Sequence, residues 1–241
     1  MNINKKFAII VITIMGFIVI AVFARGPFIQ RDNACVMDGL RYVMWSRCSV
    51  VLILLMCVGF IIIKQNEYNP MKIMKMNSRI HIWNVECFGA FIYALISSII
   101  IIMLTIVYSL FLSGGVWMNW KNANSFSAIK LGMKLENTSV IEMIILCMLL
   151  LSLQGCISLW ALMVSNEICN SYIWGLIVVL GIGINDMNGS WAPILYGRFM
   201  IQREQWLFMN NMEYIKIFIL VCIFMLVNCV GIIFARKKEY F

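Results

Sequence analysis

The sequence predicts an all-α integral membrane protein, a bundle of six helices formed by one domain over residues 1–241. Hydrophobic residues make up 63% of the chain and charged residues only 12%, whereas a typical soluble domain is about 25% charged. The apolar residues also gather into runs that suit spans, since a helix crossing about 30 Å of hydrocarbon needs about 20 residues. With only 3 prolines and no low-complexity linker, a single membrane domain is expected.

Each predicted span is an apolar run bounded by charged or polar residues. The six runs cover residues 7–24, 48–63, 87–112, 140–164, 172–184 and 217–235. The fifth is short for a span, and Gly175, Gly181 and Gly183 interrupt its side-chain surface. A broken or re-entrant helix is therefore one interpretation of it.

The first run has an alternative interpretation as a signal peptide. Lys5 and Lys6 precede it, and Val22-Phe23-Ala24 resembles a cleavage site. Its apolar stretch is longer than the usual signal core, so a membrane span is the favoured interpretation.

Six spans place both termini on one side of the membrane, and we expect that side to be the cytosol. Positive charges divide almost evenly between the two sets of connecting segments. Those on the side of the termini are concentrated in short segments next to spans, which is the pattern of cytosolic loops. The net charge of +8 then reflects loops beside anionic lipid headgroups, and no nucleic-acid partner is expected.

Several chemistries are excluded by missing residues. His81 is the only histidine, and no HExxH motif occurs, so neither a metal site nor a catalytic residue is predicted. The chain has no GxxxxGK[ST] loop, so it should not hydrolyse nucleotide by itself. No CxxC occurs, and most cysteines lie in apolar runs, although Cys35 and Cys48 could pair if they face an oxidising compartment.

Polar residues at and within the spans are candidates for function. Glu86 opens the third span and Glu142 lies near the start of the fourth, where a carboxylate can stay hydrated and favour the helix dipole. Gln154 lies near the middle of the fourth span, with Ser152 and Ser158 close to it. Hydrogen bonding between helices is the favoured role of Gln154, and substrate contact is the alternative.

The segment between the second and third spans has the pattern of an amphipathic helix. Asn69-Pro70 is a suitable helix start. Apolar residues recur at helical spacing beside a basic stripe, and the two sets are Ile73, Met76, Ile80 and Trp83, and Lys72, Lys75 and Arg79. Periodicity alone favours an interfacial helix resting on lipid headgroups.

Two stretches resemble a known family. Ser78-Arg79 followed by Trp83 and then Glu86 forms the first, and "WAPILYGRFMIQRE", from Trp191 to Glu204, contains a proline, a "YG" step and an arginine. With this span order, the chain resembles a permease subunit of the ABC-2 type. The closest resemblance is to the small six-span permeases of Gram-positive peptide-export and bacteriocin-immunity systems.

The resemblance implies an architecture and a mechanism. The segment between spans two and three would be a cytosolic coupling helix that docks on an ABC ATPase subunit, through Asn77, Ser78, Arg79, Trp83 and Glu86. The segment between spans five and six would form short extracellular helices that close the pathway, with Trp191, Pro193, Tyr196 and Arg198 as gate candidates. The partner ATPase would bind ATP and magnesium, and a second permease copy or a paralogous permease would complete the pathway.

The resulting hypothesis is a permease, not itself an enzyme, that moves an amphipathic or hydrophobic substrate such as a peptide. Lipid or a small antibiotic remains open as the substrate. A stand-alone immunity or scaffold protein that binds a toxin without transport would use the same six spans. An intramembrane enzyme acting on lipid or peptide is disfavoured, because the usual general bases are missing.

Overall fold

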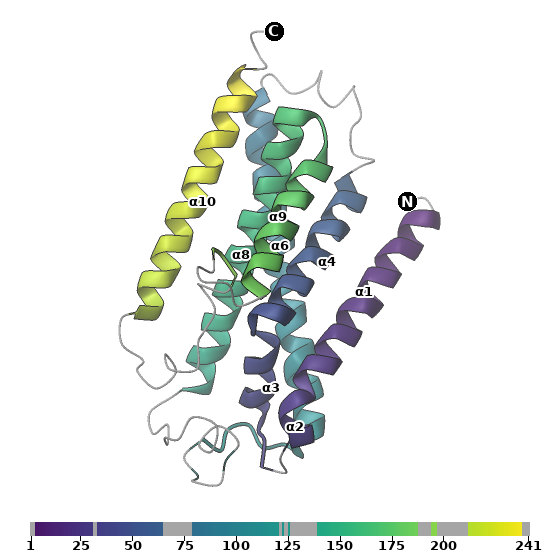
Figure 1. The fold of residues 1–241 in the computed structure, drawn as a ribbon, viewed down its shortest axis with the longest axis vertical. Coiled ribbons are helices and arrows are strands. Elements are labelled where there is room, and N and C mark those ends of the chain that lie inside the picture. The colour runs from purple at the N-terminus through teal and green to yellow at the C-terminus, as the bar shows by residue number, and fades with distance from the viewer. Residues whose placement is uncertain are drawn as a thin grey trace.

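The protein is an α-helical, multi-pass membrane protein. The computed structural model describes residues 3–30, 33–64, 79–120, 122, 125, 139–187, 194–196 and 212–237. In that part of the chain every regular element is a helix, and five helices are long and apolar enough to cross a membrane. The helices run side by side as one elongated bundle (Figure 1).

The helix bounds agree with most of the predicted spans. The elements are α1 (Ile3–Ala24), α2 (Gly26–Gln30), α3 (Val36–Val43), α4 (Ser46–Lys64), α6 (Arg79–Ser113), α8 (Val140–Cys169), α9 (Tyr172–Met187) and α10 (Met212–Lys237). The long helices α1, α4, α6, α8 and α10 each contain a predicted span. At 16 residues, α9 is about 24 Å long, which is short of the hydrocarbon thickness, so the prediction of six full spans is not confirmed.

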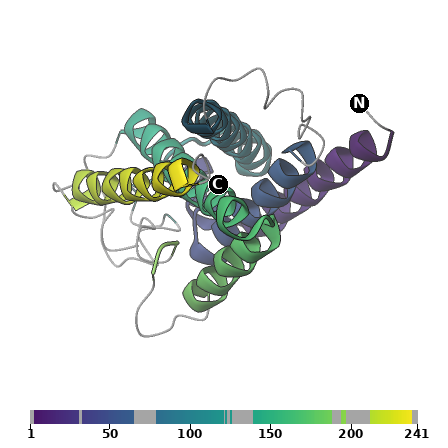
Figure 2. The same ribbon diagram turned by 90° about the horizontal axis from the view of Figure 1, so that it is seen from above.

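Helix α8 lies at the centre of the bundle. It packs against α4, α6, α9 and α10, and its buried residues occupy most of its circumference. This burial fits its sequence, which is apolar on all sides and carries only uncharged polar residues in its middle. By contrast, α1 reaches outward from the bundle toward its first residue (Figure 2).

A tight hairpin joins α8 to α9. Asn170 adopts a left-handed conformation, with φ of 51°, which ends α8 and turns the chain. The Ser165 hydroxyl donates to the Ser171 carbonyl at 2.8 Å and accepts from the Gly175 N–H at 2.7 Å. The two helices approach so closely here that a Cβ added at Gly175 would lie 2.7 Å from the Cα of Leu162.

The glycines of α9 form a packing face and do not break the helix. Gly175, Val179, Gly183 and Asp186 are buried along one side, and a Cβ at Gly183 would lie 2.6 Å from Val50 of α4. Gly181 faces open space. The interpretation of this run as a broken helix is therefore wrong within Tyr172–Met187, which is one continuous helix.

Helices α2 and α3 form an end layer that the hydropathy pattern did not predict. The first residues of α3 form backbone hydrogen bonds with the segment that follows α6. The Val36 N–H donates to the Val116 carbonyl at 3.0 Å, and the Met37 N–H donates to the Trp117 carbonyl at 3.4 Å. Asp38 accepts from the Cys35 N–H and from Trp120 Nε1, both at 3.0 Å. These bonds close one end of the bundle.

The close approach at Gly175 predicts a position-dependent effect of alanine. Gly175→Ala should lower the free energy of unfolding by about 1–3 kcal/mol, because the methyl group of the alanine would clash with the backbone of α8 at Leu162. Gly181→Ala, on the same helix, should be neutral or stabilise by up to about 1 kcal/mol, since the methyl group points at open space. Thermal unfolding in detergent measures both. Equal changes in the two variants would contradict the packing of this hairpin.

Candidate functional site

The residues expected at the coupling segment fall at the start of α6. Arg79 is the first residue of that helix and is exposed, while Asn77 and Ser78 lie outside the described residues. Glu86 forms an ion pair with Lys64 of α4, with 3.7 Å between Nζ and Oε1. The pair is partly exposed and joins the end of α4 to the beginning of α6, so Glu86 has a structural partner inside the chain.

Trp83 faces the inside of the bundle, which corrects the expectation that it faces a partner. Its side chain is 2% exposed, and Nε1 donates to Asn228 Oδ1 of α10 at 3.0 Å. The ring also fills the space over Gly231, where an added Cβ would collide with it. Helical periodicity places Trp83 on an apolar stripe, but it does not reveal that α10 covers this part of the stripe.

Trp83 and Asn228 are part of a larger contact of α10 with α6 and α8. We call this contact the aromatic seam, and it consists of Trp83, Trp160, Phe224 and Asn228. The rings of Trp160 and Phe224 stack with centroids 3.9 Å apart and planes at 25°. Trp160 Nε1 donates to the Cys87 carbonyl of α6 at 3.3 Å. The seam therefore holds α10 against both α6 and α8.

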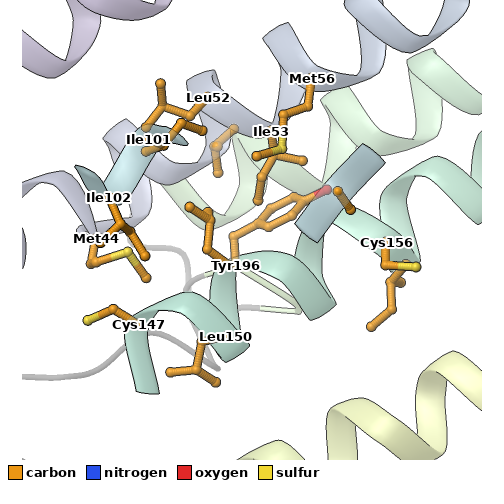
Figure 3. Close-up of a cluster of buried hydrophobic side chains, with 14 of the residues drawn as sticks. Met44, Leu52, Ile53, Met56, Ile101, Ile102, Cys147, Leu150, Cys156 and Tyr196 are labelled. Carbon is orange, nitrogen blue, oxygen red and sulfur yellow. The ribbon is translucent and has the colours of Figure 1, made fainter. Parts of the chain in front are cut away.

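On the other side of α8, a short piece of chain enters the bundle. The closing segment, residues Ile194, Leu195 and Tyr196, lies between α9 and α10 in sequence, and Tyr196 is 1% exposed. Figure 3 shows the Tyr196 ring among side chains from α4, α6 and α8, including Ile53, Met56 and Leu150. Tyr196 was expected to close the pathway at its extracellular mouth, whereas the structure places its ring within the helical core.

The hydroxyl of Tyr196 has a defined partner in that core. It lies 2.7 Å from the Ser158 hydroxyl of α8, and Ser158 donates to the Gln154 carbonyl at 2.8 Å. Because a serine hydroxyl has one proton, Tyr196 is the donor and Ser158 the acceptor. Ser158 thus provides one of the hydrogen bonds from α8 to other parts of the chain, and the side chain of Gln154 is buried.

Asp186 anchors the closing segment from the end of α9. Its carboxylate is 4% exposed and accepts the N–H groups of Ile194 at 2.7 Å, Leu195 at 3.0 Å and Tyr196 at 2.5 Å. A buried carboxylate is tolerated when such hydrogen bonds replace its water, and each one to a charged group contributes about 1.5–3 kcal/mol. These bonds dictate where the segment enters.

The sequence prediction did not include Asp186, although a signal was present. The residue follows the fifth apolar run directly, and an acidic residue at such a position is a functional candidate. Its partners lie eight to ten residues further along the chain, beyond the reach of helical periodicity. The other gate candidates, Trp191, Pro193 and Arg198, lie outside the described residues.

The remaining candidates do not join this site. Glu142 is in the first turn of α8 and exposed. Cys35 and Cys48 are both buried and free, so they form no disulfide in this structure. Burial, together with the nearby charge of Asp38, raises the pKa of the Cys35 thiol to about 12, and the thiol donates to Asp38 at 3.2 Å. In the described residues no group of side chains has the composition of a metal site.

Comparisons with protein-family models, with curated proteins and with solved structures gave no match to this chain. The chemical role of the site therefore has to be argued from its geometry. The site brings together a buried tyrosine hydroxyl, the serine hydroxyl that it contacts, and a buried carboxylate that binds the backbone of residues 194–196.

The hydrogen bonds of Asp186 predict that even the nearly isosteric change to asparagine destabilises the protein. Asp186→Asn should lower the free energy of unfolding by about 2 kcal/mol or more, because the amide group removes the charge and one acceptor from the three buried N–H groups. The matched change Glu142→Gln, at an exposed carboxylate, should stay within about 0.5 kcal/mol. Denaturant unfolding in detergent measures the two. An Asp186→Asn protein as stable as Glu142→Gln would contradict the anchor.

The aromatic seam predicts a coupling between Trp83 and Asn228. Asn228→Leu leaves the buried indole N–H without an acceptor and should cost about 1–3 kcal/mol. In the double variant with Trp83→Phe that N–H is absent, so the combined loss should be smaller than the sum of the single losses by at least about 0.5 kcal/mol. A double-mutant cycle measures the difference. Strict additivity would mean that the hydrogen bond contributes nothing.

Proposed function

We propose that this chain is the permease subunit of an ATP-driven exporter of the ABC-2 type, acting on an amphipathic or hydrophobic substrate. The observation that carries the proposal is the closing segment, which enters the bundle between α9 and α10 and fills its interior with Tyr196. Hydrogen bonds from Asp186 and Ser158 hold it there. A transporter needs such an element, because its pathway has to be shut when no substrate passes.

The geometry of α6 supports a partner on the side of the termini. At 35 residues, the helix is about 52 Å long, well beyond the hydrocarbon thickness of about 30 Å. Its first turns, which begin at Arg79, therefore extend past the hydrocarbon toward water. A rigid helix that continues out of the membrane can carry the movement of a docked ATPase into the bundle.

Helix α10 supplies the connection between these first turns and the closing segment. It follows the closing segment in the chain, and its Asn228 and Gly231 pack on Trp83 near the start of α6. A shift of α6 would act on α10 through the seam and so pull on the segment that precedes it. In this proposal Trp83 acts inside the bundle, while Arg79 remains the candidate for direct contact with the partner.

The remaining parts of the proposal follow from the sequence. ATP and magnesium belong to a separate ATPase subunit, since the chain has no phosphate-binding loop. A second permease, identical or paralogous, would complete the pathway in the bacterial cytoplasmic membrane, with both termini in the cytosol. A peptide is the substrate class that the family resemblance favours.

Isolation of partners from native membranes tests the proposal. An affinity-tagged chain should co-purify with an ABC ATPase whose ATP turnover rises in the complex. Arg79→Glu should reduce that stimulated turnover at least about fivefold with normal membrane insertion, since it reverses a charge at the proposed contact. Lys216→Glu, the same charge reversal in α10 near its first residue, serves as the control and should change turnover less than twofold.

One result would count against transport, and another against the proposed coupling contact. Purification without any ATPase under conditions that retain lipid would favour the stand-alone immunity or scaffold protein. Equal turnover in the Arg79→Glu and wild-type complexes would exclude the start of α6 as the coupling contact.

A further inference from the structure

We propose that the corner between α1 and α4 binds the headgroup of an anionic phospholipid. This arginine corner consists of Arg25, which directly follows α1, Arg47 in the first turn of α4, and the rings of Tyr42 and Trp45. Both arginines are exposed; Arg47 is the first residue of one candidate span, and Arg25 lies near the end of another, Ile9–Ile29. The inference is independent of transport.

The two aromatic rings organise the corner. Tyr42 and Trp45 meet edge to face with centroids 5.9 Å apart, and the Arg47 guanidinium lies 5.6 Å from the centre of the Trp45 ring. Tyr42 in turn lies against Gly26, where an added Cβ would be 3.1 Å from the ring. Gly26, the residue after Arg25, therefore packs on the same aromatic pair that supports Arg47.

The charge of this surface is not neutralised within the described residues. Neither Arg25 nor Arg47 forms an ion pair there. The carboxylate of α3, Asp38, is buried and binds Cys35 and Trp120. Two guanidinium groups that have no carboxylate partner among the described residues match the planar, bidentate binding of a phosphate group.

The surroundings of the corner favour a lipid over a soluble phosphate or an acidic peptide. Large apolar side chains are exposed on both sides of Arg25, with Val22 at 64% and Ile29 at 70%, and Trp45 is 42% exposed. Aromatic residues at such a boundary prefer the headgroup level. A phospholipid satisfies both requirements, because its phosphate would bind the arginines while its acyl chains cover the apolar side chains of α1.

Native mass spectrometry of the full chain in mixed micelles tests this site. With phosphatidylglycerol and phosphatidylcholine at equal concentration, the protein should retain phosphatidylglycerol preferentially. The pair Arg25→Gln and Arg47→Gln should weaken its retention about tenfold, a factor in keeping with two basic residues at an anionic surface. The pair Arg25→Lys and Arg47→Lys keeps the two positive charges but lacks the bidentate guanidinium geometry, so it should restore the retention only in part.

A second pair of substitutions provides the matched control. Arg236→Gln with Lys237→Gln removes two positive charges from the end of α10, and it should leave retention within twofold of the wild type. Equal retention of the two lipids, an unchanged signal in the Arg25 and Arg47 glutamine pair, or an equal loss in the α10 control would each overturn the proposal. Displacement of the lipid by soluble glycerol phosphate at the same concentration would also overturn it, because the acyl chains would then contribute nothing.

Discussion

The hydrogen bonds between the Asp186 carboxylate and the backbone of residues 194–196 determine how the interior of this bundle is filled. Helix α9 ends at Met187, too short to cross the hydrocarbon, and its last turn carries the acceptor that the returning chain needs. Once the closing segment is held there, the Tyr196 ring occupies the space among α4, α6 and α8 and reaches Ser158. The packing of the central helices depends on a segment that is not itself helical.

Two kinds of contact hold the bundle together: close backbone packing between helices, and hydrogen bonds to the closing segment. The α8–α9 hairpin is held by backbone that approaches within van der Waals distance at Gly175, so those two helices should move together. The closing segment is held by the polar contacts of Asp186 and Ser158 and by the burial of Leu195 and Tyr196. Helix α10, which follows that segment in the chain, is bound to α6 and α8 along the aromatic seam. Under the transport proposal, these are the parts that an ATPase would move.

The sequence predicted the long helices well because a membrane span is a local property, visible as an uninterrupted apolar run. It did not predict α3, whose eight residues mix charged and apolar side chains and fold against a distant segment through Asp38 and Trp120. Tyr196 was recognised as a candidate, but its burial depends on Asp186 and Ser158, which no local pattern connects to it. Trp83 shows the same limit, because periodicity identifies an apolar stripe and not the helix that covers it.

The burial of Tyr196 beside α8 is the central claim, and photocrosslinking tests it most directly. With p-azidophenylalanine in place of Tyr196, illumination of native membranes should attach this position to peptides of α8 around Ser158 and of α4 around Met56, as mapped by mass spectrometry. Crosslinks that form only to lipid, or to a separate protein, would show that the closing segment lies outside the bundle and would contradict the account.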